Sequence, residues 1–181
     1  TDFEVYNCRK MKNFPKVIAQ MPSLTSVNLS ANPQWVDVDE GLRALASGPA
    51  GKSVQILYMN ECSLTVLPEE LNNMKKLGLL SVASNKISKI ESAYPDVAFV
   101  QLYLDNNRLS SFPVDENGVF CYMEDAETFS VKNNDFTEFP NIFDAESIFA
   151  IVSVDFSYNH IASFPEDFRG IYVQTLTIAN N

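Results

Sequence analysis

The sequence predicts an α/β solenoid, in which successive coils each add one short strand to a shared parallel sheet. Three observations lead to this prediction. A polar residue recurs about every 25 residues, within the periods of about 20–50 residues typical of repeat architectures. Apolar residues precede it at fixed distances, and further apolar residues follow it at fixed distances. No unit of this size can bury its own apolar side chains, so neighbouring coils must cover one another.

The recurring polar residue is called the anchor. The anchors are Asn32, Cys62, Asn85, Asn107, Asn134, Asn159 and Asn181. An asparagine amide carries donors and an acceptor together, so it can satisfy backbone groups where the chain turns out of a strand. Cys62 takes the anchor position once, and we expect a small buried side chain there. Met11 and Phe14 fit the tail of an earlier, degenerate repeat whose anchor would be Arg9.

Apolar positions flank each anchor. Those five residues before it are Val27, Leu57, Leu80, Leu102, Phe129, Val154 and Leu176. Those three residues before it are Leu29, Met59, Val82, Leu104, Val131, Phe156 and Ile178. This alternation predicts a short strand with one buried face. Apolar residues also follow two and five positions after the anchor, and a proline after the second of them starts the return of the chain to the opposite layer.

The complete pattern is seen, for example, in Leu102-x-Leu104-x-x-Asn107-x-Leu109-x-x-Phe112-Pro113 and in Val154-x-Phe156-x-x-Asn159-x-Ile161-x-x-Phe164-Pro165. These segments resemble the signature of the leucine-rich repeat family, whose period is about 20–29 residues. The resemblance implies a right-handed α/β solenoid with a parallel sheet on the concave side and helices and irregular turns on the convex side. It covers nearly the whole chain, so we predict one domain over residues 1–181, with about seven repeats and the degenerate N-terminal one.

The segments that return over the convex side vary in length. Residues 38–47 predict a helix that ends at Gly48, and residues 69–76 also have a helical pattern. Residues 115–118 predict a turn, with a hairpin to residues 119–123 as one continuation. The chain begins with Thr1 and its last strand stops in mid-repeat. An open solenoid end exposes core residues, so we expect a longer native protein or an end that is covered in an assembly.

Composition excludes several classes of partner. The formal net charge is −10 and the pI is about 4.5, which argues against nucleic acid and against anionic membrane surfaces. No apolar run approaches the ~20 residues of a membrane span. Cys8, Cys62 and Cys121 match no metal-ligand spacing, and His160 is the only histidine. We therefore expect no metal, no cofactor and no catalytic constellation, and we expect His160 to be exposed.

Three further motifs suggest chemistry but fail on their context. Gly51-Lys52-Ser53 resembles the end of a phosphate-binding loop, yet a helix precedes it and a strand follows, the reverse of the order that such a loop needs. Acidic clusters contain Asp37, Asp39 and Glu40, and Glu124, Asp125 and Glu127; we expect solvated convex surface there. The glycosylation sequon at Asn28 falls within a predicted strand.

The side chains that alternate away from the core form the candidate ligand-binding surface. Most of these positions carry small polar residues, but apolar and aromatic ones gather over three adjacent repeats: Ile56, Tyr58, Leu79 and Tyr103. Asp105 and Asp155 add acidic groups to the same face. Such a patch is typical of a contact surface with tyrosine anchors, although a covering loop or simple tolerance would give the same pattern.

These observations predict a non-catalytic scaffold that binds a protein ligand through its concave face. The same tyrosines could instead stack on sugar rings, so the first alternative is a glycan-binding surface module. The second alternative is a recognition domain attached to an enzyme outside this segment. The irregular repeat lengths and the Phe-Pro endings resemble secreted or surface-anchored leucine-rich repeat proteins of gut bacteria. That resemblance implies an extracellular or cell-surface location.

Overall fold

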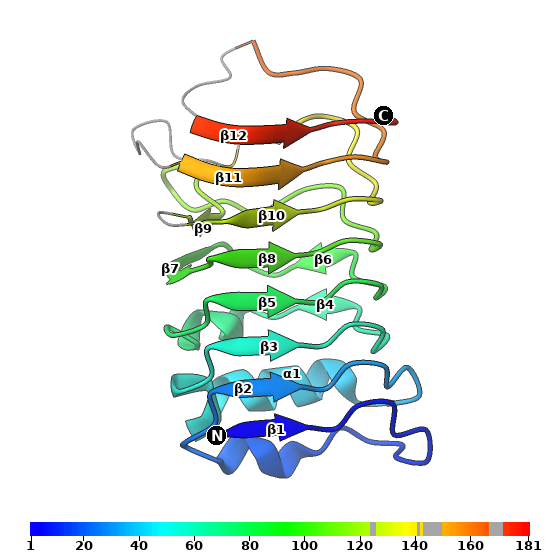
Figure 1. The fold of residues 1–181 in the computed structure, drawn as a ribbon, viewed down its shortest axis with the longest axis vertical. Helices are drawn as coiled ribbons and strands as arrows, with labels where there is room; N and C mark the ends of the chain where they lie inside the picture. The colour runs from blue at the N-terminus through cyan, green and yellow to red at the C-terminus, as the bar shows by residue number, and fades with distance from the viewer. Residues whose placement is uncertain (124–125, 141, 143–149, 167–171) are drawn as a thin grey trace.

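One eight-stranded parallel sheet runs the length of the molecule (Figure 1). A computed structural model describes residues 1–123, 126–140, 142, 150–166 and 172–181. The strands of the sheet, in spatial order, are β1 (Asp2–Glu4), β2 (Ser26–Asn28), β3 (Ile56–Tyr58), β5 (Leu79–Ser81), β8 (Gln101–Tyr103), β10 (Thr128–Ser130), β11 (Ala150–Asp155) and β12 (Tyr172–Thr177). Spatial order follows chain order, so each coil stacks directly on the previous one, as a solenoid requires.

The strand register confirms the phase of the repeat. Val27 lies opposite Leu57, and Leu57 lies opposite Leu80, so residues at the same distance from their anchors pair across neighbouring coils. The same register corrects the start of the chain: Phe3 pairs with Val27, which makes Cys8, and not Arg9, the anchor of the first coil. The turn between this anchor and Phe14 is one residue longer than the later repeats predict.

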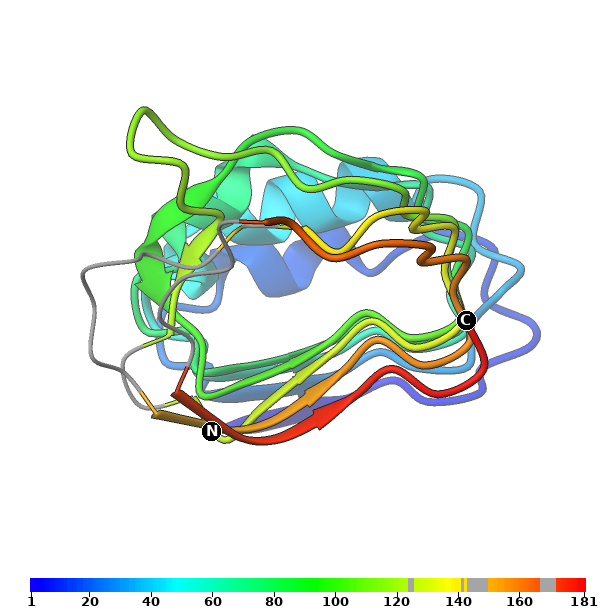
Figure 2. The same ribbon diagram turned by 90° about the horizontal axis from the view of Figure 1, so that it is seen from above.

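The opposite layer consists of short helices and strands that lie behind the sheet (Figure 2). Its helical elements are η1 (Lys16–Gln20), α1 (Val38–Ser47), η2 (Pro49–Lys52) and η3 (Glu69–Asn73). Its strands are β4 (Val66–Leu67), β6 (Lys89–Ile90), β7 (Tyr94–Ala98) and β9 (Cys121–Tyr122). They form two parallel pairs, β4 with β6 and β7 with β9.

Predictions for this layer are confirmed at α1 and corrected at two other places. The helix at residues 69–76 is a shorter 3-10 helix that ends at Asn73. Asp115 and Gly118 form the predicted turn, but no hairpin follows, because β9 pairs in parallel with β7 of the previous coil. β9 thereby adds to the contact between neighbouring coils on which a solenoid depends.

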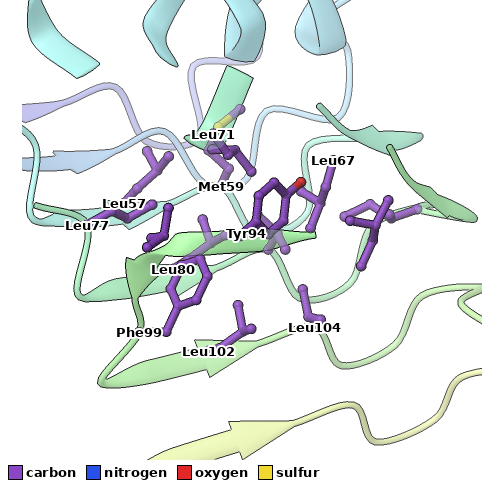
Figure 3. Packing of buried hydrophobic residues seen from close by; sticks show 14 of the residues in the cluster. Leu57, Met59, Leu67, Leu71, Leu77, Leu80, Tyr94, Phe99, Leu102 and Leu104 are labelled. Carbon is purple, nitrogen blue, oxygen red and sulfur yellow. The ribbon is translucent and has the colours of Figure 1, made fainter. Parts of the chain in front are cut away.

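The space between the two layers is filled by apolar side chains from every coil. Leucines dominate around β3 and β5, where Leu57, Leu80 and Met59 are fully buried. Figure 3 shows them converging with Tyr94 of β7 and with Phe99, which lies between β7 and β8. Later coils use phenylalanine instead. The rings that lie in mutual contact there are Phe112, Phe120, Phe129, Phe136, Phe139 and Phe156.

The anchor asparagines form a ladder of hydrogen bonds that joins the coils. Asn134 is 4% exposed. Its Nδ2 donates to the carbonyl of Val131 in its own coil and of Leu104 in the previous coil, both at 3.0 Å. Its Oδ1 accepts from the N–H of Leu109, also in the previous coil, at 2.9 Å. Because each anchor bonds backward in this way, one side chain satisfies backbone groups of two coils at once.

Cys62 takes its anchor position with a thiol in place of an amide. Cys62 is fully buried, and burial raises the pKa of its thiol to about 11. The single S–H proton lies within reach of two carbonyl acceptors, those of Leu29 at 3.1 Å and Asn60 at 3.3 Å from Sγ. The prediction of a small buried residue is confirmed. Sulfur is a weaker acceptor than an amide oxygen, so the bond that Sγ accepts from the backbone N–H of Asn32 is a weak counterpart of the acceptor half of the ladder.

The residue before each anchor has a left-handed backbone conformation. The set consists of Asn7, Ala31, Glu61, Ser84, Asn106, Asn133, Tyr158 and Asn180, with φ between 53° and 59°. From Asn7 to Tyr158, this geometry turns the N–H toward the next coil, as when Asn106 donates to the carbonyl of Lys132 at 2.8 Å. Asparagine tolerates this region, whereas a residue such as Tyr158 is strained there. The strain persists because the hydrogen bond between coils requires it.

An ion-pair network ties three coils together on the opposite layer. Arg43 of α1 pairs with Glu70 of η3 at 2.8 Å and with both carboxylate oxygens of Glu91, which follows β6. All three side chains are only 24–33% exposed. The Arg43 guanidinium holds the pKa of Glu91 below its ordinary value, against the opposing effect of burial. A carboxyl group with a lowered folded-state pKa stabilises the fold above its ordinary pKa, and that contribution is lost as the pH falls.

We expect Arg43→Met to lower the free energy of unfolding by about 1–2 kcal/mol at neutral pH, since charged hydrogen bonds that are partly screened by solvent are lost. The difference from the wild type should shrink as the pH falls below about 4.5 and Glu91 takes up a proton in both proteins. Urea denaturation at a series of pH values measures the difference in the free energy of unfolding between the two proteins. Lys75→Met, which breaks the exposed pair with Asp96, is the matched control and should change stability little. A difference that stays constant across the pH series would contradict this account.

Candidate ligand-binding face

The register of the sheet brings the predicted surface residues together. In the part of the chain that the structure describes, Tyr58, Ser81 and Tyr103 occupy one row across β3, β5 and β8. Ile56, Leu79 and Gln101 occupy the next row along the same strands. We call the exposed side of the eight-stranded sheet the sheet face, and we call the group of Ile56, Tyr58, Leu79 and Tyr103 the apolar patch.

Strand alternation points the apolar patch away from the core. In β3 the central residue Leu57 is fully buried, and its neighbours Ile56 and Tyr58 are half-buried. β8 has the same pattern around Leu102, with Tyr103 half-buried beside it. The phenol of Tyr103 lies 3.5 Å from the Gln101 amide oxygen, the outer limit for a hydrogen bond.

Asp105 lies at the end of the apolar patch, where its carboxylate caps the neighbouring coil. Its Oδ1 accepts from the backbone N–H of Lys132 at 2.8 Å and from the hydroxyl of Ser130. Asn60 makes the same pair of bonds two coils earlier, to Ser81 and Ala83. Burial raises the pKa of Asp105, and the charge of Asp155 raises it further. Asp105 therefore both supports the sheet and presents a poorly solvated acid on its face.

Asp155 is bonded more locally. Its Oδ1 accepts from the N–H of Ser157 at 2.7 Å, as Asn28 accepts from Ser30 in an earlier coil. The side chain is half-buried and belongs to the same row as Tyr103, with Ser130 between the two residues. The apolar patch thus occupies the middle of the sheet face, and the two carboxylates lie on its C-terminal side.

A pocket opens at the N-terminal ends of the same strands, and sequence reasoning missed it. It is a shallow, open hollow with a volume of about 360 Å³. It is lined by Gln55, Ile56, Lys76, Gly78, Leu79, Val100, Gln101 and Glu127. Four of these residues lie seven positions before their anchors, a column outside the strict alternation of the strands. One feature of the sequence could have indicated the pocket: Gly78 lacks a side chain at the position where the adjacent coils carry Gln55 and Val100.

The motifs set aside at the sequence level have structural roles. Gly51 belongs to η2, and a Cβ there would lie 2.3 Å from the Ala46 carbonyl oxygen, so close packing rather than phosphate binding requires the glycine. The next residue, Lys52, ends η2 directly before the turn into β3. His160 is exposed, as predicted.

The acidic cluster near α1 corrects a prediction, because its carboxylates do not form a simple solvated surface. Asp37 accepts from the N–H of Phe14 at 2.8 Å, and Asp39 accepts from the N–H of Thr65 at 2.9 Å. Both bonds join neighbouring coils, which sequence spacing within one coil could not reveal. Glu40 is exposed. In the second cluster, Glu124 and Asp125 lie outside the described residues, and Glu127 lines the pocket.

Residues that could support metal or covalent chemistry do not assemble in the described ranges. The structure describes no group of three or more histidine, cysteine, aspartate or glutamate side chains able to hold a metal ion there. Burial raises the pKa of the Cys121 thiol well above its ordinary value, which disfavours the reactive thiolate. None of the described helices combines the length and apolar character needed to cross a bilayer.

Comparison with known proteins identifies relatives of similar fold. No protein-family model matches the chain. It is similar to the crystal structure of a leucine-rich repeat protein from Bacteroides eggerthii, with 32% identity and a TM-score of 0.87 over 100% of this chain and 31% of that one. A leucine-rich repeat protein from Bacteroides thetaiotaomicron gives 33% identity and a TM-score of 0.84 over 97% of this chain and 22% of that one.

Among curated sequences, bovine lumican is 26% identical over 121 residues, which are 65% of this chain and 34% of lumican. The chain thus spans about a third or less of the lengths of these three proteins. The structural similarity to the two Bacteroides proteins covers essentially all of this chain. Repeat pattern, strand register and structural similarity together show that the chain is a leucine-rich repeat solenoid, similar to leucine-rich repeat proteins of Bacteroides.

Proposed function

We propose that this solenoid is a non-catalytic scaffold that binds a protein ligand through its sheet face, centred on the apolar patch. The observation that carries the proposal is the gathering of Ile56, Tyr58, Leu79 and Tyr103 in two adjacent rows of the sheet. Elsewhere these rows carry mostly small polar side chains. Leucine-rich repeat folds serve generally as interaction scaffolds, which supports the same reading without identifying the face or the ligand.

Tyrosine suits this role for a physical reason. Its large ring adds contact area at little cost in conformational entropy, and its hydroxyl can bond to a polar group of the ligand. Tyr58 and Tyr103 are half-buried, so their free rotation is already restricted before a ligand arrives. Hot spots in protein interfaces are enriched in such side chains, whereas the small polar residues around them serve to exclude water.

We expect Tyr58→Ala and Tyr103→Ala each to weaken ligand binding by roughly 30-fold, the effect of losing about 2 kcal/mol of interaction. Both side chains point away from the core, so stability should change little. Affinity capture with the immobilised chain, quantified by mass spectrometry against each variant, measures the loss. Tyr122→Ala is the control, because this tyrosine lies in β9 on the opposite layer. Protein ligands that bind both variants as they bind the wild type would rule out the apolar patch.

Glycan binding remains the alternative use of the same tyrosines, which could stack on sugar rings. A glycan array probed with the wild-type chain separates the two functions. Signals on the array that disappear in Tyr58→Ala and Tyr103→Ala, with no protein retained specifically by the wild type, would replace the protein ligand with a glycan.

We also propose an extracellular or cell-surface location, supported by the similarity to the Bacteroides proteins. Cell fractionation with an antibody to the chain tests it.

A further inference from the structure

We propose that the pocket beside the apolar patch receives a large apolar side chain of the protein ligand, which carries basic residues next to it. This proposal rests on the proposed function, because it assigns the chemistry of the ligand at the same face. The pocket and the patch share Ile56 and Leu79. A ligand that covers the two tyrosines therefore lies across the mouth of the pocket as well.

The lining of the pocket combines apolar and polar side chains. Ile56, Leu79 and Val100 supply aliphatic surface, and Val100 is 37% exposed although it is large and hydrophobic. Gln55 and Gln101 add amide groups to the same lining. Such a combination favours one apolar group that enters and a polar chain that stays at the rim.

Gly78 keeps the pocket open. A Cβ built on this glycine would meet only Val100 Cγ2 at 3.7 Å and the Gln55 carbonyl oxygen at 4.0 Å, both at ordinary contact distance. Its φ does not lie in the left-handed region. Neither close packing nor backbone conformation therefore demands a glycine here, in contrast to Gly51. What the missing side chain leaves is space between two coils on the sheet face.

Charge on the sheet face specifies the rest of the ligand. Among the described strands and their ends, the face carries five carboxylates: Asp2, Glu4, Asp105, Glu127 and Asp155. Its basic group is Lys132, which lies over the ring of Tyr158 at 5.1 Å from the ring centre, and Lys76 stands at the rim of the pocket. Burial opposes ionisation of Asp105 and raises its pKa, and the charge of Asp155 adds a smaller repulsion. A cationic segment of the ligand would relieve this repulsion and be drawn toward the face.

Glu127 is placed to meet that segment first. Its Oε2 accepts from the Gln101 Nε2 at 2.7 Å, which holds the carboxylate at the rim of the pocket. Its side chain is exposed, so the other oxygen can pair with a lysine or arginine of the ligand. The expected recognition element is thus a large aliphatic or aromatic residue flanked by basic residues, bound by apolar burial and by complementary charge.

A phage library of random peptides, selected on the immobilised chain, tests this inference. Enriched peptides should combine a large apolar residue with neighbouring lysine or arginine. Gly78→Leu, which fills the pocket, should weaken their binding by roughly tenfold or more. Thr175→Leu adds a leucine at an exposed position of the sheet face in β12 and should bind as the wild type does. Val100→Glu provides a second variant that needs no added space in the core, and circular dichroism verifies that each variant is folded.

The outcomes distinguish failure of the pocket proposal from failure of the proposed function. Peptides that bind Gly78→Leu and Val100→Glu normally but lose affinity for Tyr58→Ala would overturn the pocket and keep the apolar patch. Peptides that bind every variant equally would overturn both. A library that yields acidic peptides, or no enriched peptide, would overturn the ligand chemistry proposed here. Glu127→Gln should reduce binding several-fold and should reduce its sensitivity to salt.

Discussion

Replacing Asn134 with alanine is expected to lower the free energy of unfolding by about 2–3 kcal/mol. The substitution removes the partner of the buried Leu109 N–H. It also removes one of the two bonds that the carbonyls of Leu104 and Val131 accept, because Asn107 and Asn159 donate to the same carbonyls. Each buried group that loses its partner costs about 1–3 kcal/mol. The loss is large because a single side chain satisfies two coils, so its removal weakens the interface on which a solenoid depends.

Urea denaturation followed by circular dichroism measures this loss. Asn73→Ala is the matched control, because Asn73 is an exposed asparagine at the end of η3 and should change stability by less than about 0.5 kcal/mol. Equal stability of Asn134→Ala and Asn73→Ala would show that the anchors do not hold the coils together. The hydrogen-bond ladder would then be a consequence of the fold and not one of its causes.

Leu102→Ala is expected to cost about 3 kcal/mol, within the range of about 2–5 kcal/mol for a leucine removed from a packed core. Leu102 is 1% exposed and lies between Leu80 and Phe129 in the sheet register. The coils on either side hold their own side chains in place, so little collapse into the cavity is expected. Thermal and urea denaturation of the variant give the value. A loss below about 1 kcal/mol would mean that the core around β8 is loosely packed, against the density typical of protein interiors.

The phase of the repeat could be predicted from the sequence because it rests on short-range periodicity. Positions five and three before the anchors from Asn32 to Asn159 fill the core, whereas Leu176 and Ile178 before Asn181 are only partly buried. The anchor asparagines bond to backbone as their chemistry suggests. α1 was also predictable, since its amphipathic pattern ends at Gly48. Assigning Ile56 and Tyr58 to one face followed from the same alternation, and the register then showed that they meet Leu79 and Tyr103 across the strands.

Features that depend on contacts between coils could not be predicted in the same way. The first anchor is Cys8 because β1 pairs with β2, whereas the apolar residues after it suggest a position one residue later. Asp37 and Asp39 bond to the preceding and following coils, and no spacing within one coil encodes such partners. The pocket likewise arises between coils, where Gly78, Val100 and Glu127 come together from three different repeats.

The central claim is that the repeat phase divides adjacent residues of one strand between core and ligand surface. Leu102 and Tyr103 test it most directly, since they are neighbours in β8 and point to opposite sides. The measurement is the free energy of unfolding together with retention of captured protein ligands for Leu102→Ala and Tyr103→Ala. We predict that Leu102→Ala lowers the free energy of unfolding by about 3 kcal/mol. Tyr103→Ala should lose ligand retention and keep its stability. Loss of stability with normal retention in Tyr103→Ala would contradict the claim.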